Sequence, residues 1–255
     1  NMDKQDIRCI FSDDNSENLI MRIQPFEGSD DKEDCEEDMI CVLKSLEKTI
    51  LNDITLTGVK DIKGVSNVSW GNNPPTSNNT SSSILTYYKD GAEMHQETEF
   101  LWGDLSYLKT YQIPLLAGRE RLNDSIREYV VNETFAKALG FQNAPDVIGA
   151  TVKLDTMSIS IVGLMKDFNQ RSLRSTINPM ALTGDWGNGG YSNFRSIHFD
   201  LGKNPEQWTK SIDAVEQALA SVYPDEELEV QFMDEMVEGF YRSEKSTVQL
   251  LKWAT

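Results

Sequence analysis

The sequence predicts an α+β fold in which two strand–helix–strand units flank a long inserted block. Residues 18–70 and 195–233 follow the same order of strand, amphipathic helix and strand. The charge also changes along the chain: residues 104–185 hold 9 basic and 9 acidic residues, whereas the whole chain holds 24 basic and 41 acidic residues. Two such units packed side by side form a split βαβ, or ferredoxin-like, sheet with its helices on one face.

The first unit begins with a strand over residues 18–26, in which Leu19, Met21 and Ile23 fall on one face. After an acidic stretch, apolar residues recur at the spacing of a helix: Met39, Leu43, Leu46, Ile50 and Ile54. A second strand over residues 64–70 completes the unit.

The insertion opens with a polar loop over residues 72–83, whose Pro, Asn and Ser content is typical of a mobile connection. A hairpin is expected next, with strands at 84–88 and 96–102 and a turn at 89–91.

Beyond the hairpin lies a compact block, predicted to be an inserted small domain, with two short helices and a second hairpin. Asp104 is expected to cap the first helix, which carries Leu105, Leu108 and Tyr111. Asn132 is expected to cap the second helix, which Gly140 ends. The expected strands are 151–154 and 158–166, and the glycine-rich residues 184–190 lead back to the second unit.

The second unit begins with a strand over residues 195–201. Alternation places Ile197, Phe199 and Leu201 inward, and Ser196, His198 and Asp200 outward. Asn204 and Pro205 begin a helix, and its apolar stripe is Trp208, Ile212, Val215, Leu219 and Val222. The last strand is expected over residues 228–233.

Residues 234–253 predict an amphipathic helix that no Gly, Asn or Pro closes. The chain also begins abruptly at Asn1, without a charged leader or an apolar signal core. We expect both ends to continue in a longer polypeptide; the alternative is a frayed terminal helix packed on the core.

Composition narrows the class of function. The net charge of −17 disfavours nucleic acid and anionic lipid surfaces, because both require clustered Lys and Arg. The longest apolar runs, such as residues 39–43, are far shorter than the roughly 18 residues of a membrane span. Cys9, Cys35 and Cys41 lack metal-ligand spacing, and a disulfide between two of them stays open.

Catalytic signals are sparse. The two histidines, His95 and His198, are both expected to face outward on strands, and no Ser or Cys lies in a nucleophile motif. The glycines of residues 184–190 lack the Lys-Ser/Thr of a phosphate-binding loop. We therefore expect no catalytic, cofactor-binding or metal-binding residues.

Two further features have a structural and a functional interpretation. Asp13, Asn15 and Glu17 alternate like the first calcium ligands of an EF-hand, but the Gly and the closing Glu of that loop are absent, which favours a polar turn. Trp186 lies in the glycine-rich connection, where it either contacts a partner or covers the junction between lobes.

Five segments carry a resemblance to a known family. They are IKGVSNVSWGNNPP (62–75), YLKTYQIPLLAGRE (107–120), REYVVNETFAKALGF (127–141), PDVIGATVKLD (145–155) and ISIVGLMKDFNQRSLRSTINPMAL (159–182). In this order they resemble the extracytoplasmic domain of MacB/FtsX-type ABC transporter permeases, and especially the copies found in Bacteroidetes. The resemblance covers most of residues 54–255, and the acidic segment before it departs from the usual compact version.

The resemblance implies a porter-like lobe, made of the two βαβ halves, and an inserted Sabre-like lobe. On this basis the porter-like lobe takes residues 1–103 and 186–255, the inserted lobe takes residues 104–185, and residues 246–255 begin a transmembrane helix. It also implies that ATP is hydrolysed by a separate cytoplasmic subunit or domain. A non-catalytic domain at the periplasmic face of the bacterial inner membrane would then couple hydrolysis to export or mechanotransmission.

The partners implied are the ATP-binding subunit, reached through membrane helices, a periplasmic adaptor or cargo protein, and a second copy in the full transporter. Three alternatives stay open. They are a partner-activating module like the FtsX-type regulators of cell-wall hydrolases, a secreted hydrolase, and a small-molecule-binding module.

Overall fold

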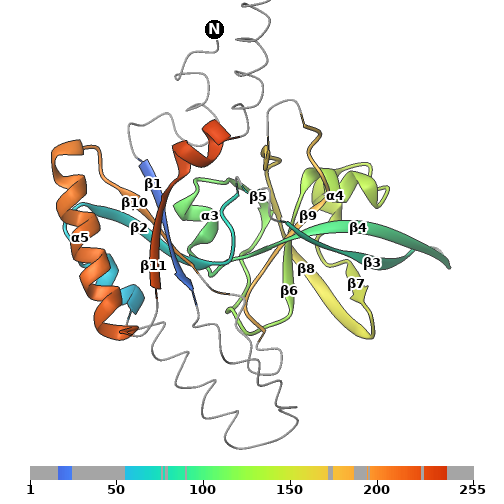
Figure 1. Ribbon diagram of the computed structural model, residues 1–255. Coiled ribbons are helices and arrows are strands. Elements are labelled where there is room, and N and C mark those ends of the chain that lie inside the picture. The colour runs from blue at the N-terminus through green and yellow to red at the C-terminus, as the bar shows by residue number, and fades with distance from the viewer. Residues whose placement is uncertain are drawn as a thin grey trace, which may run out of the picture.

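The computed structural model of the protein describes residues 17–24, 55–75, 77, 80–89, 91–171, 175–186, 194, 196–224 and 227–239. These residues form two sheets that lie side by side, with the short helix α3 (Tyr107–Thr110) between them (Figure 1). The predicted α+β class is confirmed.

The first sheet has four antiparallel strands in the order β11-β1-β10-β2. Their bounds are β1 Glu17–Gln24, β2 Val65–Gly71, β10 Ser196–Leu201 and β11 Glu227–Phe232. Strands of the first unit alternate with strands of the second, which is the order of a split βαβ sheet. The two halves of the chain are therefore hydrogen-bonded to each other across the insertion.

Helix α5 (Pro205–Val222) lies along one face of this sheet (Figure 1). The side chain of Asn204 accepts a hydrogen bond from the N–H of Glu206, so the predicted cap is confirmed. Val215 and Leu219 of α5 and Val59 of the short helix at 55–60 pack with the strands in one core cluster. The helix expected over residues 39–54 lies outside the described residues.

The second sheet is mixed, and six of its strands close into a ring. The order is β5-β8-β6-β9-β4-β3-β7, and the pairing of β7 with β8 closes the ring, so that β5 is attached to β8 alone. Two pairs, β4 with β9 and β6 with β8, are parallel. The strands are β3 Ser81–Lys89, β4 Ala92–Trp102, β5 Leu115–Gly118, β6 Glu128–Asn132, β7 Thr151–Leu154, β8 Met157–Met165 and β9 Met180–Thr183.

Strand β6 of the closed sheet is buried on both faces. Tyr129 and Val131 of β6 pack with α4 (Glu133–Ala138) and the 3-10 helix η1 (Ala144–Val147) in one cluster, whereas Val130 between them joins a second cluster with α3. Alternate residues of a strand point to opposite faces, so α3 and α4 cover opposite sides of the same strands.

The hairpin expected at 84–88 and 96–102 is confirmed as β3 and β4. The expected lobe boundary at residue 103 assigned this hairpin to the first lobe. Its strands pair instead with β7 and β9, and so belong to the closed sheet. Sequence periodicity identifies a hairpin but not its partners, because pairing between distant segments leaves no local pattern.

Replacing Asn132 with Ala should be strongly destabilising. This buried side chain accepts hydrogen bonds from the N–H groups of Phe135 (3.0 Å) and Met180 (2.9 Å), and donates one to the carbonyl of Asn178 (3.0 Å). Its loss leaves several buried backbone groups without partners, and we expect a cost of about 2–4 kcal/mol.

Urea unfolding measures this cost, and Asn204→Ala at the exposed cap of α5 is the matched control, with an expected cost of about 1 kcal/mol. Equal losses in the two variants would show that Asn132 acts as an ordinary helix cap only.

Candidate functional site

The backbones of the two sheets meet at a short stretch, which we call the junction and define as residues 69–72 and 102–104. Gly71 of β2 and Gly103, which follows β4, form an antiparallel bridge. On either side of this bridge, the N–H of Asn72 donates to the carbonyl of Trp102 (3.1 Å), and the N–H of Asp104 donates to that of Trp70 (2.9 Å). The strand β4 therefore leaves the closed sheet and continues onto the edge of the four-stranded sheet.

The junction is also tied to β9. The N–H of Gly103 donates to the carbonyl of Thr183 (3.1 Å), and Arg121 Nη2 donates to the carbonyl of Gly103 (2.7 Å). A single residue thus makes contacts with β2, with β9 and with the loop after β5.

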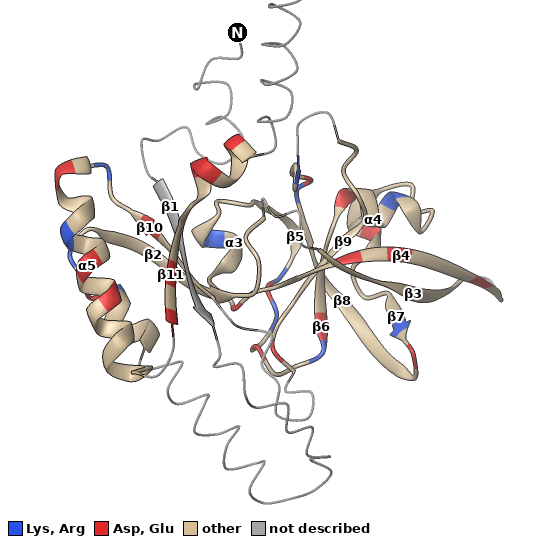
Figure 2. Cartoon of the chain, viewed as in Figure 1, with Lys and Arg blue, Asp and Glu red and all other residues tan. Residues whose placement is uncertain are grey.

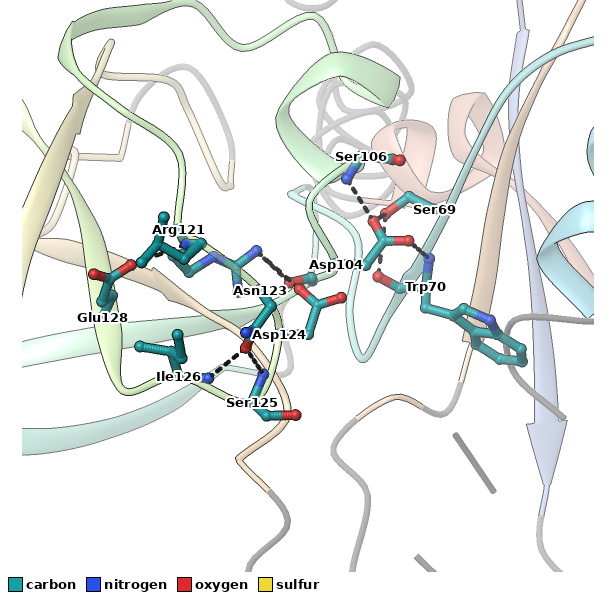
Figure 3. A network of polar contacts seen from close by, with 12 residues as sticks. Ser69, Trp70, Asp104, Ser106, Arg121, Asn123, Asp124, Ser125, Ile126 and Glu128 are labelled. Atoms are coloured by element: carbon teal, nitrogen blue, oxygen red, sulfur yellow. Dashed lines mark hydrogen bonds and ion pairs between the residues drawn. The ribbon is translucent and has the colours of Figure 1, made fainter. Parts of the chain in front are cut away.

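Asp104 is the polar centre of the junction (Figure 3). Its buried carboxylate accepts hydrogen bonds from Ser69 Oγ (2.7 Å), from the N–H of Trp70 (3.0 Å) and from the N–H of Ser106 (2.8 Å). Burial raises the pKa of Asp104, while these hydrogen bonds act in the opposite direction. One side chain therefore fixes both the edge of β2 and the start of α3.

The sequence predicted Asp104 as the N-cap of a helix, and this is corrected in part. Ser106 occupies the N-cap position of α3, two residues later. Asp104 holds the backbone of Ser106, but two of its three hydrogen bonds go to β2, which lies more than 30 residues earlier in the chain. Its main contribution is tertiary, and the local capping pattern did not reveal it.

Close backbone approach at the junction requires glycine. A Cβ atom at Gly103 would lie 2.3–2.6 Å from atoms of the Tyr107 side chain, and one at Gly71 would lie 2.7 Å from His198 Cε1. Any larger residue at either position has to push the two sheets or α3 apart.

His198 was predicted to face outward, and this is wrong. Its side chain is fully buried, and its ring lies 5.9 Å from that of Tyr107 and 5.6 Å from that of Tyr111. Ser196 and Asp200, also expected outward, are buried as well. The reason is that α3 covers the second face of β10 and β2, so this strand is buried on both sides.

A cluster of charges lies beside the junction, in the loop between β5 and β6 (Figures 2 and 3). The Arg121 side chain has no exposed surface, and its Nη2 lies 3.6 Å from Asp124 Oδ1. Burial lowers the pKa of Arg121, and the carboxylates around it oppose that shift. Both carboxylate oxygens of Glu120 are buried, and this burial raises the pKa of the group. The charge and the backbone N–H of Arg121 lie close enough to lower that pKa in part.

Arg119 and Glu128 form a second ion pair at the rim of this cluster. Two guanidinium nitrogens of Arg119 donate to the two carboxylate oxygens of Glu128, one of them at 2.8 Å. The side-chain hydrogen bonds from Arg119 lower the pKa of Glu128. The N–H of Leu122 donates to the same carboxylate (3.0 Å), so that the loop is fixed onto the start of β6.

A further contact between the sheets, made by side chains, involves the last described helix, at residues 233–239. It begins directly after β11 of the four-stranded sheet. Met233 is buried in the core cluster that contains Leu101 of β4 and Leu108 of α3. The start of the helix predicted over residues 234–253 therefore touches the closed sheet as well as the four-stranded sheet, and its continuation lies outside the described residues.

The other candidate residues have different positions. His95 is exposed on β4, as predicted, with Nδ1 at 3.3 Å from Thr86 Oγ1. Trp186 packs on Tyr129 at a ring distance of 5.6 Å and covers the core of the closed sheet. Asp13, Asn15 and the three cysteines lie outside the described residues, whereas Glu17, the third residue of the calcium-like pattern, begins strand β1.

Within the described part of the chain, no group of three or more His, Cys, Asp and Glu side chains is placed to hold a metal ion. None of the described helices has the length and apolar character needed to cross a membrane.

Comparison with solved structures identifies the fold. The chain is similar to the periplasmic region of MacB from Actinobacillus actinomycetemcomitans, with a TM-score of 0.56 and 14% identity over 93% of this chain and 97% of that one. The protein therefore has a fold like that of the MacB periplasmic region.

Weaker similarity extends to two other structures. One is the extracellular domain of the noncanonic ABC-type transporter YknZ from Gram-positive bacteria, with a TM-score of 0.48 and 11% identity over 69% of this chain and 87% of that one. The other is a domain of a putative permease protein from Porphyromonas gingivalis, with a TM-score of 0.47 and 15% identity over 87% and 90%.

One family model also matches the chain. It describes RNA polymerase Rpb1, domain 7, and covers residues 1–57. This segment precedes the junction and the whole closed sheet, and most of it lies outside the described residues.

Gly103→Ala should destabilise the protein by about 1–3 kcal/mol, because the added methyl group overlaps the side chain of Tyr107. Denaturant unfolding monitored by tryptophan fluorescence measures the loss. The matched control is Gly58→Ala in the helix at 55–60, where a Cβ atom meets nothing within 4 Å and should add about 0.5–1 kcal/mol of stability. A neutral Gly103→Ala would contradict the close packing described for the junction.

Proposed function

We propose that this chain is a non-catalytic periplasmic domain of an ABC-transporter permease. It couples cytoplasmic ATP hydrolysis to export, or to mechanical signalling, across the envelope. The likeness of its fold to the periplasmic region of MacB over 93% of the chain supports this proposal, as do the five sequence segments that resemble permease domains.

The observation that carries the proposal is the connection between the two sheets, which consists of the junction and the packing of Met233. A domain that transmits displacement needs a stiff route from the element that moves to the surface that acts. Residues 233–239 follow the four-stranded sheet directly, and Met233 packs into the core of the closed sheet. The junction joins the same two sheets through backbone and carboxylate hydrogen bonds. A push on this helix therefore reaches both sheets.

The same proposal implies a cellular location and partner proteins for the domain. The domain lies at the periplasmic face of the bacterial inner membrane and is anchored by transmembrane helices. Through these helices it works with a cytoplasmic ATP-binding subunit or domain. A second copy completes the transporter, and the outer surface contacts a periplasmic adaptor or a cargo protein.

In this proposal the inserted lobe is the part of the domain farther from the membrane. The expected mobility of residues 72–83 and 184–190 stays a prediction. The N–H of Asn72, the first residue of the earlier segment, donates to the carbonyl of Trp102, which supports movement of the two sheets as one body.

Asp104→Ala in the full-length protein should uncouple ATP hydrolysis from function. It removes three hydrogen bonds that join β2, β4 and α3, and leaves the membrane spans and the ATPase untouched. In a strain that lacks the gene, we expect the variant to be produced and to support ATP hydrolysis in membranes, but to complement the deletion phenotype poorly.

Ser69→Ala removes one of the three hydrogen bonds and should give an intermediate effect. Asp213→Ala on the exposed side of α5 is the matched control and should complement fully. Full complementation by Asp104→Ala, or turnover of a small substrate by the isolated domain with ordinary saturation kinetics, would contradict the proposal.

A further inference from the structure

We propose that one face of the β3–β4 hairpin is a docking surface for a partner protein that presents Lys or Arg side chains beside an apolar group. That this partner is a periplasmic adaptor or a cargo protein rests on the function proposed above, whereas the binding chemistry of the face does not. We call it the outer face, and it consists of alternate side chains of three adjacent strands: Ile84, Thr86 and Tyr88 of β3, Glu93, His95 and Glu97 of β4, and Thr151 and Lys153 of β7.

The opposite face of these strands is the one that the core covers. Leu85 of β3 and Val152 of β7 are fully buried in the core cluster that contains residues of α4 and η1. Tyr87 packs against the same cluster. Alternation along a strand therefore directs the outer-face side chains away from that core. They are exposed, except for Thr86, which is half-buried.

Two large apolar side chains lie in the central row of the outer face. Ile84 is 58% exposed and Tyr88 is 50% exposed, and alternation places both on the same side of β3. The ammonium group of Lys153 lies 5.1 Å from the centroid of the Tyr88 ring. A partner that covers Ile84 and Tyr88 removes their apolar surface from water, which favours binding. An apolar centre with polar groups around it is the usual composition of a protein–protein contact.

The charges beside this row define the chemistry of the partner. Glu97 lies opposite Ile84, and Glu93 lies opposite Tyr88, on the neighbouring strand β4. Glu97 accepts a hydrogen bond from Ser82 Oγ (3.2 Å), and Glu93 Oε1 lies 3.6 Å from His95 Nε2. Among the described residues, no Lys or Arg forms an ion pair with either glutamate. A guanidinium or ammonium group of a partner can therefore pair with these carboxylates next to apolar surface.

The same charges disfavour other occupants. A row of carboxylates repels the phosphates of nucleic acids and of anionic lipids. A second copy of this chain carries a net charge of −17 and is also repelled at an acidic row. By strand spacing and rise, the outer face measures only roughly 10–15 Å in each direction, which is small for a permanent interface. We therefore expect a basic partner that binds reversibly.

The position of the outer face agrees with contact to an external partner. Figure 1 shows the β3–β4 hairpin extending away from the four-stranded sheet and from the helix at 233–239. The partner can thus approach the hairpin without displacing either of these elements.

An NMR titration of the 255-residue chain tests the binding chemistry. The probe is a short peptide of arginine and leucine with blocked termini, and the control peptide has glutamate in place of arginine. We expect the arginine peptide to shift the backbone amide signals of residues 84–97 and 151–153 at concentrations at which the control peptide shifts none. Because the whole chain is acidic, equally large shifts along α5 would show general electrostatic adsorption and would overturn the inference.

The double variant Glu93→Gln/Glu97→Gln should weaken binding of the arginine peptide by roughly three- to tenfold, because two exposed ion pairs are lost. The matched control, Asp213→Asn/Glu216→Gln on α5, removes the same charge elsewhere and should leave the affinity unchanged. Equal weakening in the two variants would refute a specific role of the β4 glutamates.

In the full-length protein, Ile84→Ser/Tyr88→Ser should be produced and should support ATP hydrolysis in membranes, but complement the deletion phenotype poorly. Both side chains are exposed, and thermal unfolding checks that the variant stays folded. Leu122→Ser is the control, because it also removes an exposed apolar side chain, 63% exposed, but away from the outer face. Full complementation by Ile84→Ser/Tyr88→Ser would contradict the docking role.

These results are separable from the proposed function. If the arginine peptide binds selectively at the outer face while Asp104→Ala complements fully, the docking surface stands and the coupling role falls. If the peptide shows no selectivity while Asp104→Ala uncouples, the reverse holds.

Discussion

The hydrogen bonds of the Asp104 carboxylate are the constraint on which the arrangement of the two sheets depends. The carboxylate fixes the edge of β2 on one side and the first turn of α3 on the other, at the point where β4 leaves the closed sheet. A buried carboxylate is costly unless its oxygens have several donors, and three donors meet this one. In either sheet alone the Asp104 carboxylate would lack some of these donors and would be destabilising. Its hydrogen bonds therefore stabilise the two sheets only when they are associated.

The position of α3 follows from this joint and explains the burial around it. Because Asp104 and Gly103 place Tyr107 directly over the four-stranded sheet, the second face of β10 is covered and His198 is enclosed by two tyrosine rings. The sheet is therefore packed against α5 on one side and against the inserted block on the other. The junction thus both connects the two sheets and buries the second face of β10. The charge cluster around Arg121 lies beside it, because Arg121 donates a hydrogen bond to the carbonyl of Gly103.

Local patterns in the sequence predicted most of the described elements, because strand alternation, the Asn132 and Asn204 caps and the left-handed Gly140 are each set by neighbouring residues. They also predicted the split sheet, since the two units repeat.

The ring closure of β7 on β8 and the burial of His198 depend on segments far apart in the sequence, and alternation alone misplaced that side chain. The sequence did not predict the junction for the same reason, because its contacts join segments that are far apart in the chain. A signal was present in the run Arg119-Glu120-Arg121 and Asp124 after a glycine, but charge runs usually lie on solvated surfaces, and only the fold shows that Arg121 is buried.

The central claim is that the junction makes the two sheets one mechanical body. The most direct measurement is the distance between spin labels at the exposed positions 213, on α5, and 156, in the turn between β7 and β8, recorded by double electron–electron resonance. A stiff joint predicts a single narrow distance distribution in the wild-type chain and a clearly broader one in Asp104→Ala. A broad distribution in the wild type, or identical distributions in the two proteins, would contradict it.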